Sequence, residues 1–171
     1  MPEKTLAAVL VAERQFEMRE LDIPEIPDDA ALLKIEACGI CGSDIHGSKR
    51  LGDGPKVLGH ENVGIVARIG HRASEKWKVR EGDRIALEEY VPCGSCKWCL
   101  SDDFRFCDQT DRAGSLRYGT TSLKVWPSLW GGYSQYMYVH PDAVVHKMPN
   151  HIPAPHAAAF LPFSNGIEWG L

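Results

Sequence analysis

Metal-binding and acid–base side chains gather near residue 41 of the chain. The sequence reads GICGSDIH at positions 39–46 and GHE at positions 59–61. These two runs supply a thiolate, imidazoles, carboxylates and a hydroxyl. Cysteine, histidine and carboxylate are the usual ligands of a catalytic zinc ion that keeps one position open. Each residue alone is compatible with a buried cysteine or a surface histidine, but the cluster as a whole favours a metal site.

A second pattern follows downstream, where four cysteines stand with C-x2-C-x2-C-x7-C spacing. Four thiolates close in sequence are typical of a structural zinc ion, which they surround completely. Two disulfides or free thiols are the alternatives. An iron–sulfur cluster is a lesser one, because the distant fourth cysteine does not fit the ferredoxin run. The sequence therefore predicts a zinc lobe over residues 93–107, held by Cys93, Cys96, Cys99 and Cys107.

The composition of the chain indicates its fold class, its partners and its cellular compartment. The 171 residues carry a net charge of −4, which gives no reason to expect a nucleic-acid partner. With 16 Gly and 11 Pro, the chain predicts many turns and a mainly β domain. Thiolates kept for metal indicate a reducing compartment, so we expect a cytoplasmic protein. The apolar run at 6–12 suits a strand better than a signal peptide, and no run is long enough for a membrane span.

Several strands are expected from alternating apolar and polar residues. Residues 6–12 and 15–21 predict an opening hairpin, in which Phe16 and Met18 make the second strand half-buried. Further strands are expected at 30–38, 63–69 and 85–88. The strand at 30–38 would deliver the chain to the first cluster, where Ser43 is expected to cap a short helical turn.

The aromatic residues and the end of the chain are less regular. Tyr118, Trp126 and Trp130 either line a substrate cleft or pack within loops. From residue 156 the sequence becomes Ala-rich and helical, and Pro162 is expected to separate two helical pieces.

The two runs of the first cluster, together with Asn62, Val63 and Gly64, resemble the zinc signature of the medium-chain alcohol and polyol dehydrogenases. The four-cysteine lobe has the spacing of that family's structural-zinc lobe, although Asp102 stands where many relatives have Gly. The resemblance implies a GroES-like, partly open β-barrel with short helices as the catalytic domain, over residues 1–155. Residues 156–171 would begin the helical connection to a Rossmann domain. No G-x-G-x-x-G run is present, so we expect this chain to lack the nucleotide-binding half and assign it no cofactor-binding residue.

The resemblance also implies which residues hold a catalytic zinc. Cys41 and His60 match ligands, and Glu61 matches a carboxylate that is a ligand in some members and only nearby in others. Relatives carry a further Cys or Glu immediately before a proline in the first helix after the barrel. Here that position is Leu161, which cannot coordinate, so Glu61 or water is expected to complete the site.

The remaining polar residues match a proton relay. By resemblance, Ser43 accepts the alcohol proton, His46 passes it to solvent and Asp44 orients the ligand histidine. The implied reaction oxidises a small-molecule alcohol to an aldehyde or ketone by hydride transfer to NAD or NADP, with one catalytic and one structural zinc. Neither nucleic acid nor membrane is expected as a partner, and the resemblance allows a homo-oligomer.

Two other functions compete with this one. A stand-alone zinc-binding module without redox activity would explain the missing nucleotide half, but it would have no need of the relay. A relative that has lost the catalytic zinc and reduces enones or quinones would explain Leu161, but not the retained Cys41 and His60.

Overall fold

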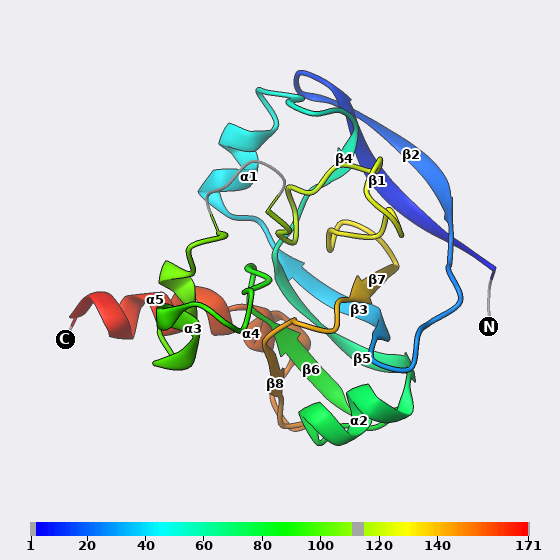
Figure 1. Ribbon diagram of the computed structural model, residues 1–171. Helices are drawn as coiled ribbons and strands as arrows, with labels where there is room; N and C mark the ends of the chain where they lie inside the picture. Colours follow the sequence, from blue (N-terminus) through cyan, green and yellow to red (C-terminus); the bar gives the residue numbers. More distant parts are fainter. Residues whose placement is uncertain (1–2, 111–114, 171) are drawn as a thin grey trace.

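The computed structural model describes residues 3–110 and 115–170, and this part of the chain is mainly β (Figure 1). Its strands form two antiparallel sheets, with the orders β2-β1-β4 and β7-β3-β5-β6-β8. The architecture confirms the prediction of a mainly β domain with short helices. The strands are β1 Lys4–Ala12, β2 Gln15–Asp22, β3 Ala31–Gly39, β4 Lys56–Val57, β5 Glu61–Ile69, β6 Arg84–Leu87, β7 Tyr136–Val139 and β8 Val145–Lys147.

The opening hairpin is present, with β1 and β2 paired from Lys4↔Asp22 to Ala12↔Gln15. The expectation that β2 would be half-buried is wrong. Phe16 and Met18 are 46% and 63% exposed, and nearly the whole strand faces solvent. Alternation shows which residues share a face, but it does not show whether another layer covers that face. Strand β2 lies at the edge of its sheet, and the side chains of Phe16 and Met18 remain uncovered.

The pairing of β3 with β5 brings the first cluster together. In this register Gly39, the last residue of β3, lies opposite Glu61, the first residue of β5. Cys41 follows the one strand and His60 precedes the other, so both leave the sheet at the same edge. A Cβ atom on Gly39 would collide with the Glu61 carboxylate, and glycine therefore makes this close approach of the two strands possible.

Behind that edge lies the main core, built on β3, β5, β6 and β7. Tyr118 and Trp130 belong to it, with exposures of 1% and 2% and ring centroids 5.9 Å apart. Packing is therefore the correct interpretation of these two aromatic residues, and neither lines an open cleft. Trp126 is different, since 59% of it is exposed and its ring meets the edge of Tyr138.

The helices are short and lie around the sheets (Figure 1). None of the described helices is both long and apolar enough to cross a bilayer. One of them, α2, was not predicted, because its seven mostly polar residues give no helical period. The helices are α1 Gly42–Gly47, α2 His71–Trp77, α3 Lys97–Leu100, the 3-10 turn Phe104–Phe106, α4 Ala154–Ala158 and α5 Phe160–Gly170.

Two helix boundaries differ from expectation. The N-cap of α1 is Cys41 rather than Ser43, and the third helical residue, Asp44, accepts the backbone N–H of Cys41. The break between α4 and α5 falls at Ala159 rather than at Pro162. Pro162 lies in the first turn of α5, where the missing N–H would have had no helical partner.

Candidate metal centres

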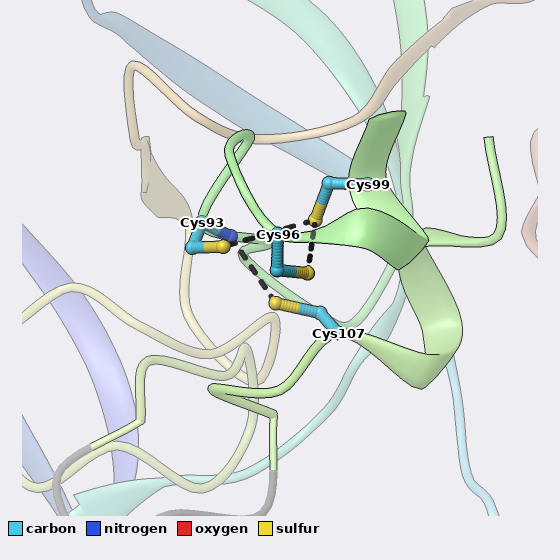
Figure 2. Close-up of side chains that lie close together, drawn as sticks. All are labelled: Cys93, Cys96, Cys99 and Cys107. Atoms are coloured by element: carbon cyan, nitrogen blue, oxygen red, sulfur yellow. Dashed lines mark hydrogen bonds between the residues drawn. The ribbon is translucent and has the colours of Figure 1, made fainter. Parts of the chain in front are cut away.

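The four downstream cysteines converge on one point, as Figure 2 shows. None of them forms a disulfide. The Sγ atoms of Cys93 and Cys99 are 3.9 Å apart, and those of Cys96 and Cys99 are 3.6 Å apart. Tetrahedral zinc with Zn–S bonds of about 2.3 Å requires sulfur–sulfur separations of about 3.8 Å. The two sulfur–sulfur separations therefore fit a zinc ion.

The protonation of these thiols is uneven. Hydrogen bonds from the backbone and hydroxyl of Ser95 lower the pKa of Cys93 to about 6, whereas burial raises the pKa of Cys99 to about 12. A bound cation would stabilise the negative charges of four thiolates held this close together. The loop that closes the lobe places Asp102 at φ 65°, the left-handed conformation that glycine favours. Asp occupies this region more readily than most other residues.

The first cluster brings together Cys41, His60 and Glu61, whose ligand atoms lie within 4.8 Å of one another. Zinc bound to sulfur, nitrogen and oxygen at about 2.0–2.3 Å requires ligand separations of about 3.3–3.8 Å. A small inward movement of the side chains would therefore give the geometry of a zinc site. His60 is only 6% exposed, so the ring has a fixed place at the bottom of the cluster.

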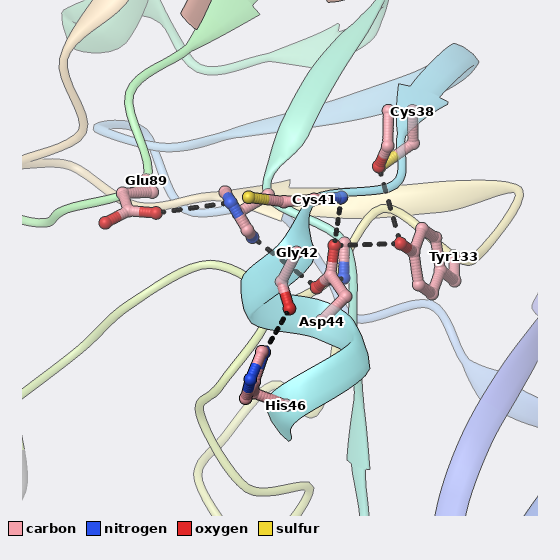
Figure 3. A network of polar contacts seen from close by, with 10 residues as sticks. Cys38, Cys41, Gly42, Asp44, His46, Glu89 and Tyr133 are labelled. Atoms are coloured by element: carbon pink, nitrogen blue, oxygen red, sulfur yellow. Dashed lines mark hydrogen bonds and ion pairs between the residues drawn. The ribbon is translucent and has the colours of Figure 1, made fainter. Parts of the chain in front are cut away.

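Asp44 fixes the orientation of His60 (Figure 3). Its Oδ1 lies 3.5 Å from Nδ1 of His60 and accepts the N–H of Gly59. Its Oδ2 accepts hydrogen bonds from the Cys41 N–H at 3.0 Å and from the Tyr133 hydroxyl at 2.9 Å. Nδ1 of His60 is thereby engaged, which leaves Nε2 for a metal. A carboxylate behind a ligand histidine is the usual arrangement in zinc sites.

The charges around the cluster favour an anionic Cys41 and a cationic His60 while no metal is bound. Burial opposes protonation of His60, but the hydrogen bond that His60 donates to Asp44 and the charges of Glu89 and Asp44 outweigh it and raise the pKa of His60 to about 9. Hydrogen bonds from the side chain and backbone of Ser43 lower the pKa of Cys41. Ser43 therefore lies directly beside the thiolate.

His46 is not part of the cluster. Its ring is exposed, and its Nδ1 lies 2.8 Å from the carbonyl oxygen of Gly42 one turn earlier in α1. Figure 3 shows it at the end of α1 away from Cys41. Because a carbonyl can only accept, Nδ1 must carry the hydrogen, and Nε2 is the nitrogen free to take up a proton.

A family model described as the alcohol dehydrogenase GroES-like domain matches residues 27–150. The chain belongs to this family. The match includes both cysteine-bearing clusters, so the two candidate metal centres lie inside the family domain.

Two curated relatives and one solved structure illustrate the similarity. A probable alcohol dehydrogenase of Mycobacterium tuberculosis is 38% identical over 167 residues, which cover 96% of this chain and 45% of that protein. An erythritol/L-threitol dehydrogenase of Mycolicibacterium smegmatis is 32% identical, covering 98% of this chain and 47% of that protein. The crystal structure of an alcohol dehydrogenase from Thermotoga maritima matches with a TM-score of 0.76 and 27% identity, covering 92% of this chain and 44% of that one. The GroES-like domain described here thus spans about half the length of its curated relatives.

One functional candidate in this alcohol dehydrogenase domain was missed by sequence reasoning. Glu89 follows β6 and places its Oε2 3.4 Å from Nε2 of His60. It lines a cavity of about 240 Å³ together with Leu161, the apolar residue at the position where resembled relatives carry a ligand. The available signal was an acidic pair, Glu88-Glu89, at the end of a strand and just before the four-cysteine lobe.

Proposed function

We propose that this chain is the catalytic domain of a zinc-dependent alcohol or polyol dehydrogenase. The observation that carries the proposal is the meeting of Cys41, His60 and Glu61 at one sheet edge, with Ser43 beside the Cys41 thiolate. A binding module would need metal ligands but no hydroxyl at that position. The relatives named as alcohol and polyol dehydrogenases support the same reading.

Two zinc ions are proposed, with different roles. Cys93, Cys96, Cys99 and Cys107 would surround a structural ion completely and hold the lobe together. Cys41, His60 and Glu61 would hold the second and leave a position for substrate. When bound there, zinc supplies Lewis acidity that polarises the oxygen of an alcohol. Asp44 keeps the ring of His60 in the orientation that presents Nε2 to this ion.

Proton transfer is assigned to α1. The Ser43 hydroxyl accepts the proton of the substrate hydroxyl and passes its own proton outward. His46 takes that proton at Nε2, since its Nδ1–H is held by the Gly42 carbonyl. Both side chains are exposed, so the proton reaches solvent without crossing the core. Imidazole is the side chain best suited to taking up and releasing a proton near neutral pH.

The complete reaction needs a nicotinamide. The substrate carbon gives a hydride to NAD or NADP, the alcohol becomes an aldehyde or ketone, and the hydroxyl proton leaves through Ser43. We assign the catalytic domain to residues 1–155 and the start of a helical connection to a nucleotide-binding domain to residues 156–171. Free thiols at all six cysteines suit a reducing compartment such as the cytoplasm.

Counting zinc tests the proposal. The chain should hold two ions, and Glu61→Ala should lower the number toward one, because the more weakly held ion loses one of its protein ligands. Glu75→Ala is the matched control, since that carboxylate lies exposed on α2 and is 68% accessible. Released zinc is read during competition with a graded series of chelators. Two ions held with unchanged affinity in Glu61→Ala would remove Glu61 from the ligand set.

Activity separates the competing functions. The gene product that carries this chain should oxidise small alcohols with NAD or NADP, and Cys41→Ser should abolish this activity while leaving one zinc bound. A single zinc in the unaltered chain would favour an enone or quinone reductase. Two zinc ions with no oxidation of any alcohol or polyol would favour a zinc-binding module.

A further inference from the structure

His60 is contacted by carboxylates on both ring nitrogens, and the two carboxylates are not equivalent. The one from Asp44 is 6% exposed and accepts hydrogen bonds from two backbone N–H groups and from Tyr133. It is therefore fixed in place and can only orient the ring. The one from Glu89 lies at Nε2, the nitrogen that Asp44 does not contact.

Glu89 is free to change partner. Within the described residues, its side chain forms one ion pair, the one with His60, and 24% of the side chain is accessible. It borders the cavity of about 240 Å³ that also contains Leu161 and Asn165. Its carboxylate therefore has room to rotate without losing any other hydrogen bond.

The separation between the two groups is that of neighbouring zinc ligands. Oε2 of Glu89 lies 3.4 Å from Nε2 of His60. A tetrahedral zinc ion with bonds of about 2.0–2.1 Å to nitrogen and oxygen places such ligands about 3.3–3.4 Å apart. Leu161 is 5% exposed, lines the same cavity and offers no atom that could coordinate a metal.

We propose that Glu89 is the fourth protein ligand of the zinc held by Cys41, His60 and Glu61, and takes the place that Leu161 cannot fill. This inference rests on the proposed function, because it presumes that a zinc ion binds at the first cluster. Glu89 lies outside the three-residue group whose ligand atoms are mutually close. Its carboxylate would move from the ion pair with His60 onto the ion, and back again to leave that position to the substrate.

The test compares zinc binding by the 171-residue chain and by Glu89→Gln, which keeps the shape and removes the charge. The more weakly held zinc should lose more than about 100-fold in affinity, beyond the roughly 10–100-fold that follows loss of a residue that only orients a ligand. Zinc in the four-cysteine lobe should be unaffected. Glu75→Gln, on the exposed face of α2, is the control.

Two further readouts distinguish a ligand from a neighbour. With cobalt in place of zinc, Glu89→Gln should change the intensity of the d–d absorption, because a protein ligand is lost. The double variant Glu89→Ala/Leu161→Glu should regain much of the zinc affinity that Glu89→Ala loses, since it returns a carboxylate to the same cavity from α5.

The outcomes separate this inference from the proposed function. If Glu89→Gln keeps its cobalt spectrum, or loses no more than about 100-fold in zinc affinity, Glu89 is only an ion-pair partner of His60 and the inference is wrong. If Cys41→Ser releases a zinc ion that Glu89→Gln retains, the proposed metal site stands and only the role of Glu89 fails. If the unaltered chain holds zinc at the four cysteines alone, both fail.

Discussion

The hydroxyl of Tyr133 donates a hydrogen bond of 2.9 Å to Oδ2 of Asp44, across 89 positions of sequence. Through Asp44 it acts on His60, whose Nδ1 lies 3.5 Å from the other oxygen of the same carboxylate. A segment just before β7 therefore helps to set the orientation of a residue just before β5. This contact couples the packing of the domain to the geometry of the candidate catalytic zinc site.

Tyr133→Phe removes this donor and leaves the ring in place. A hydrogen bond to a charged group contributes about 1.5–3 kcal/mol, and we expect the free energy of unfolding to fall by that amount. Zinc affinity at Cys41 and His60 should fall about tenfold, because Asp44 orients His60 less firmly. Urea denaturation and chelator competition measure the two effects. Tyr136→Phe is the control, since the hydrogen bonds of Tyr136 within the described residues are made by its backbone N–H and carbonyl groups. Equal behaviour of the two variants would contradict the role given to Tyr133.

The four-cysteine lobe should depend on its metal. Its two helical turns, α3 and the 3-10 turn at residues 104–106, bury none of their own side chains, so the lobe has little apolar core. Structural zinc contributes an apparent binding free energy on the order of 10 kcal/mol in small sites. Cys99→Ser should therefore release one zinc and expose the lobe to proteolysis, with β1 to β6 still folded. Full zinc retention by elemental analysis would show that the lobe does not need this thiolate.

The metal-binding residues were predictable from the sequence because their signals are local. Four cysteines within fifteen positions, and a Cys-x-Ser-Asp run before Gly-His-Glu, carry their chemistry in their spacing. The hairpin of β1 and β2 was predictable for the same reason, since alternation is a property of neighbouring residues.

Contacts between distant segments could not be predicted in this way. Glu89 reaches His60 because β5 pairs with β6, and no spacing rule links the two positions. Tyr133 meets Asp44 by packing alone. The solvent exposure of side chains could not be predicted either. Strand β2 is exposed at a sheet edge, whereas Tyr118 and Trp130, in an irregular segment, are buried in the core.

A buried carboxylate links the four-cysteine lobe to the barrel. Glu88 at the end of β6 is 3% exposed, and its Oε1 lies 3.7 Å from Nη2 of Arg105 and 3.3 Å from Nε2 of His146. The same Nη2 donates to the hydroxyl of Ser164 in α5 at 2.8 Å. Arg105 thus joins the lobe, the barrel and the last helix around one charge.

Arg105→Met should leave the Glu88 charge poorly compensated. Removing one partner of a buried pair typically costs about 3–5 kcal/mol, and we expect a loss of stability toward the lower end because one fifth of the Arg105 side chain is exposed. In the background of Glu88→Gln the same substitution should cost much less. Urea denaturation of the unaltered chain, the two single variants and the double variant gives the coupling free energy between Arg105 and Glu88. Arg50→Met, at an exposed position, is the control. Additive effects would show that the pair does not act as a unit.

His140 should make the domain sensitive to mild acid. Burial lowers the pKa of its imidazole and outweighs the opposing charges of Asp142 and Asp29, while Lys76 adds to the lowering. The ring packs against Trp130 at 5.8 Å, and its Nδ1 accepts the backbone N–H of Asp142 at 3.1 Å, which requires that nitrogen to be unprotonated. The folded state therefore favours the neutral imidazole.

The sign of the pH effect follows from this preference. An unfolded histidine has a pKa of about 6.5, so below that pH the unfolded chain binds a proton that the folded chain accepts only at lower pH. The contribution of His140 to stability is fully present above about pH 6.5 and declines as the pH falls. Urea denaturation from neutral to mildly acidic pH should show this decline, and His140→Gln, which cannot titrate, should reduce it. His151→Gln, at an exposed position after β8, should leave the decline unchanged. An identical pH profile in His140→Gln would assign the acid sensitivity to other groups.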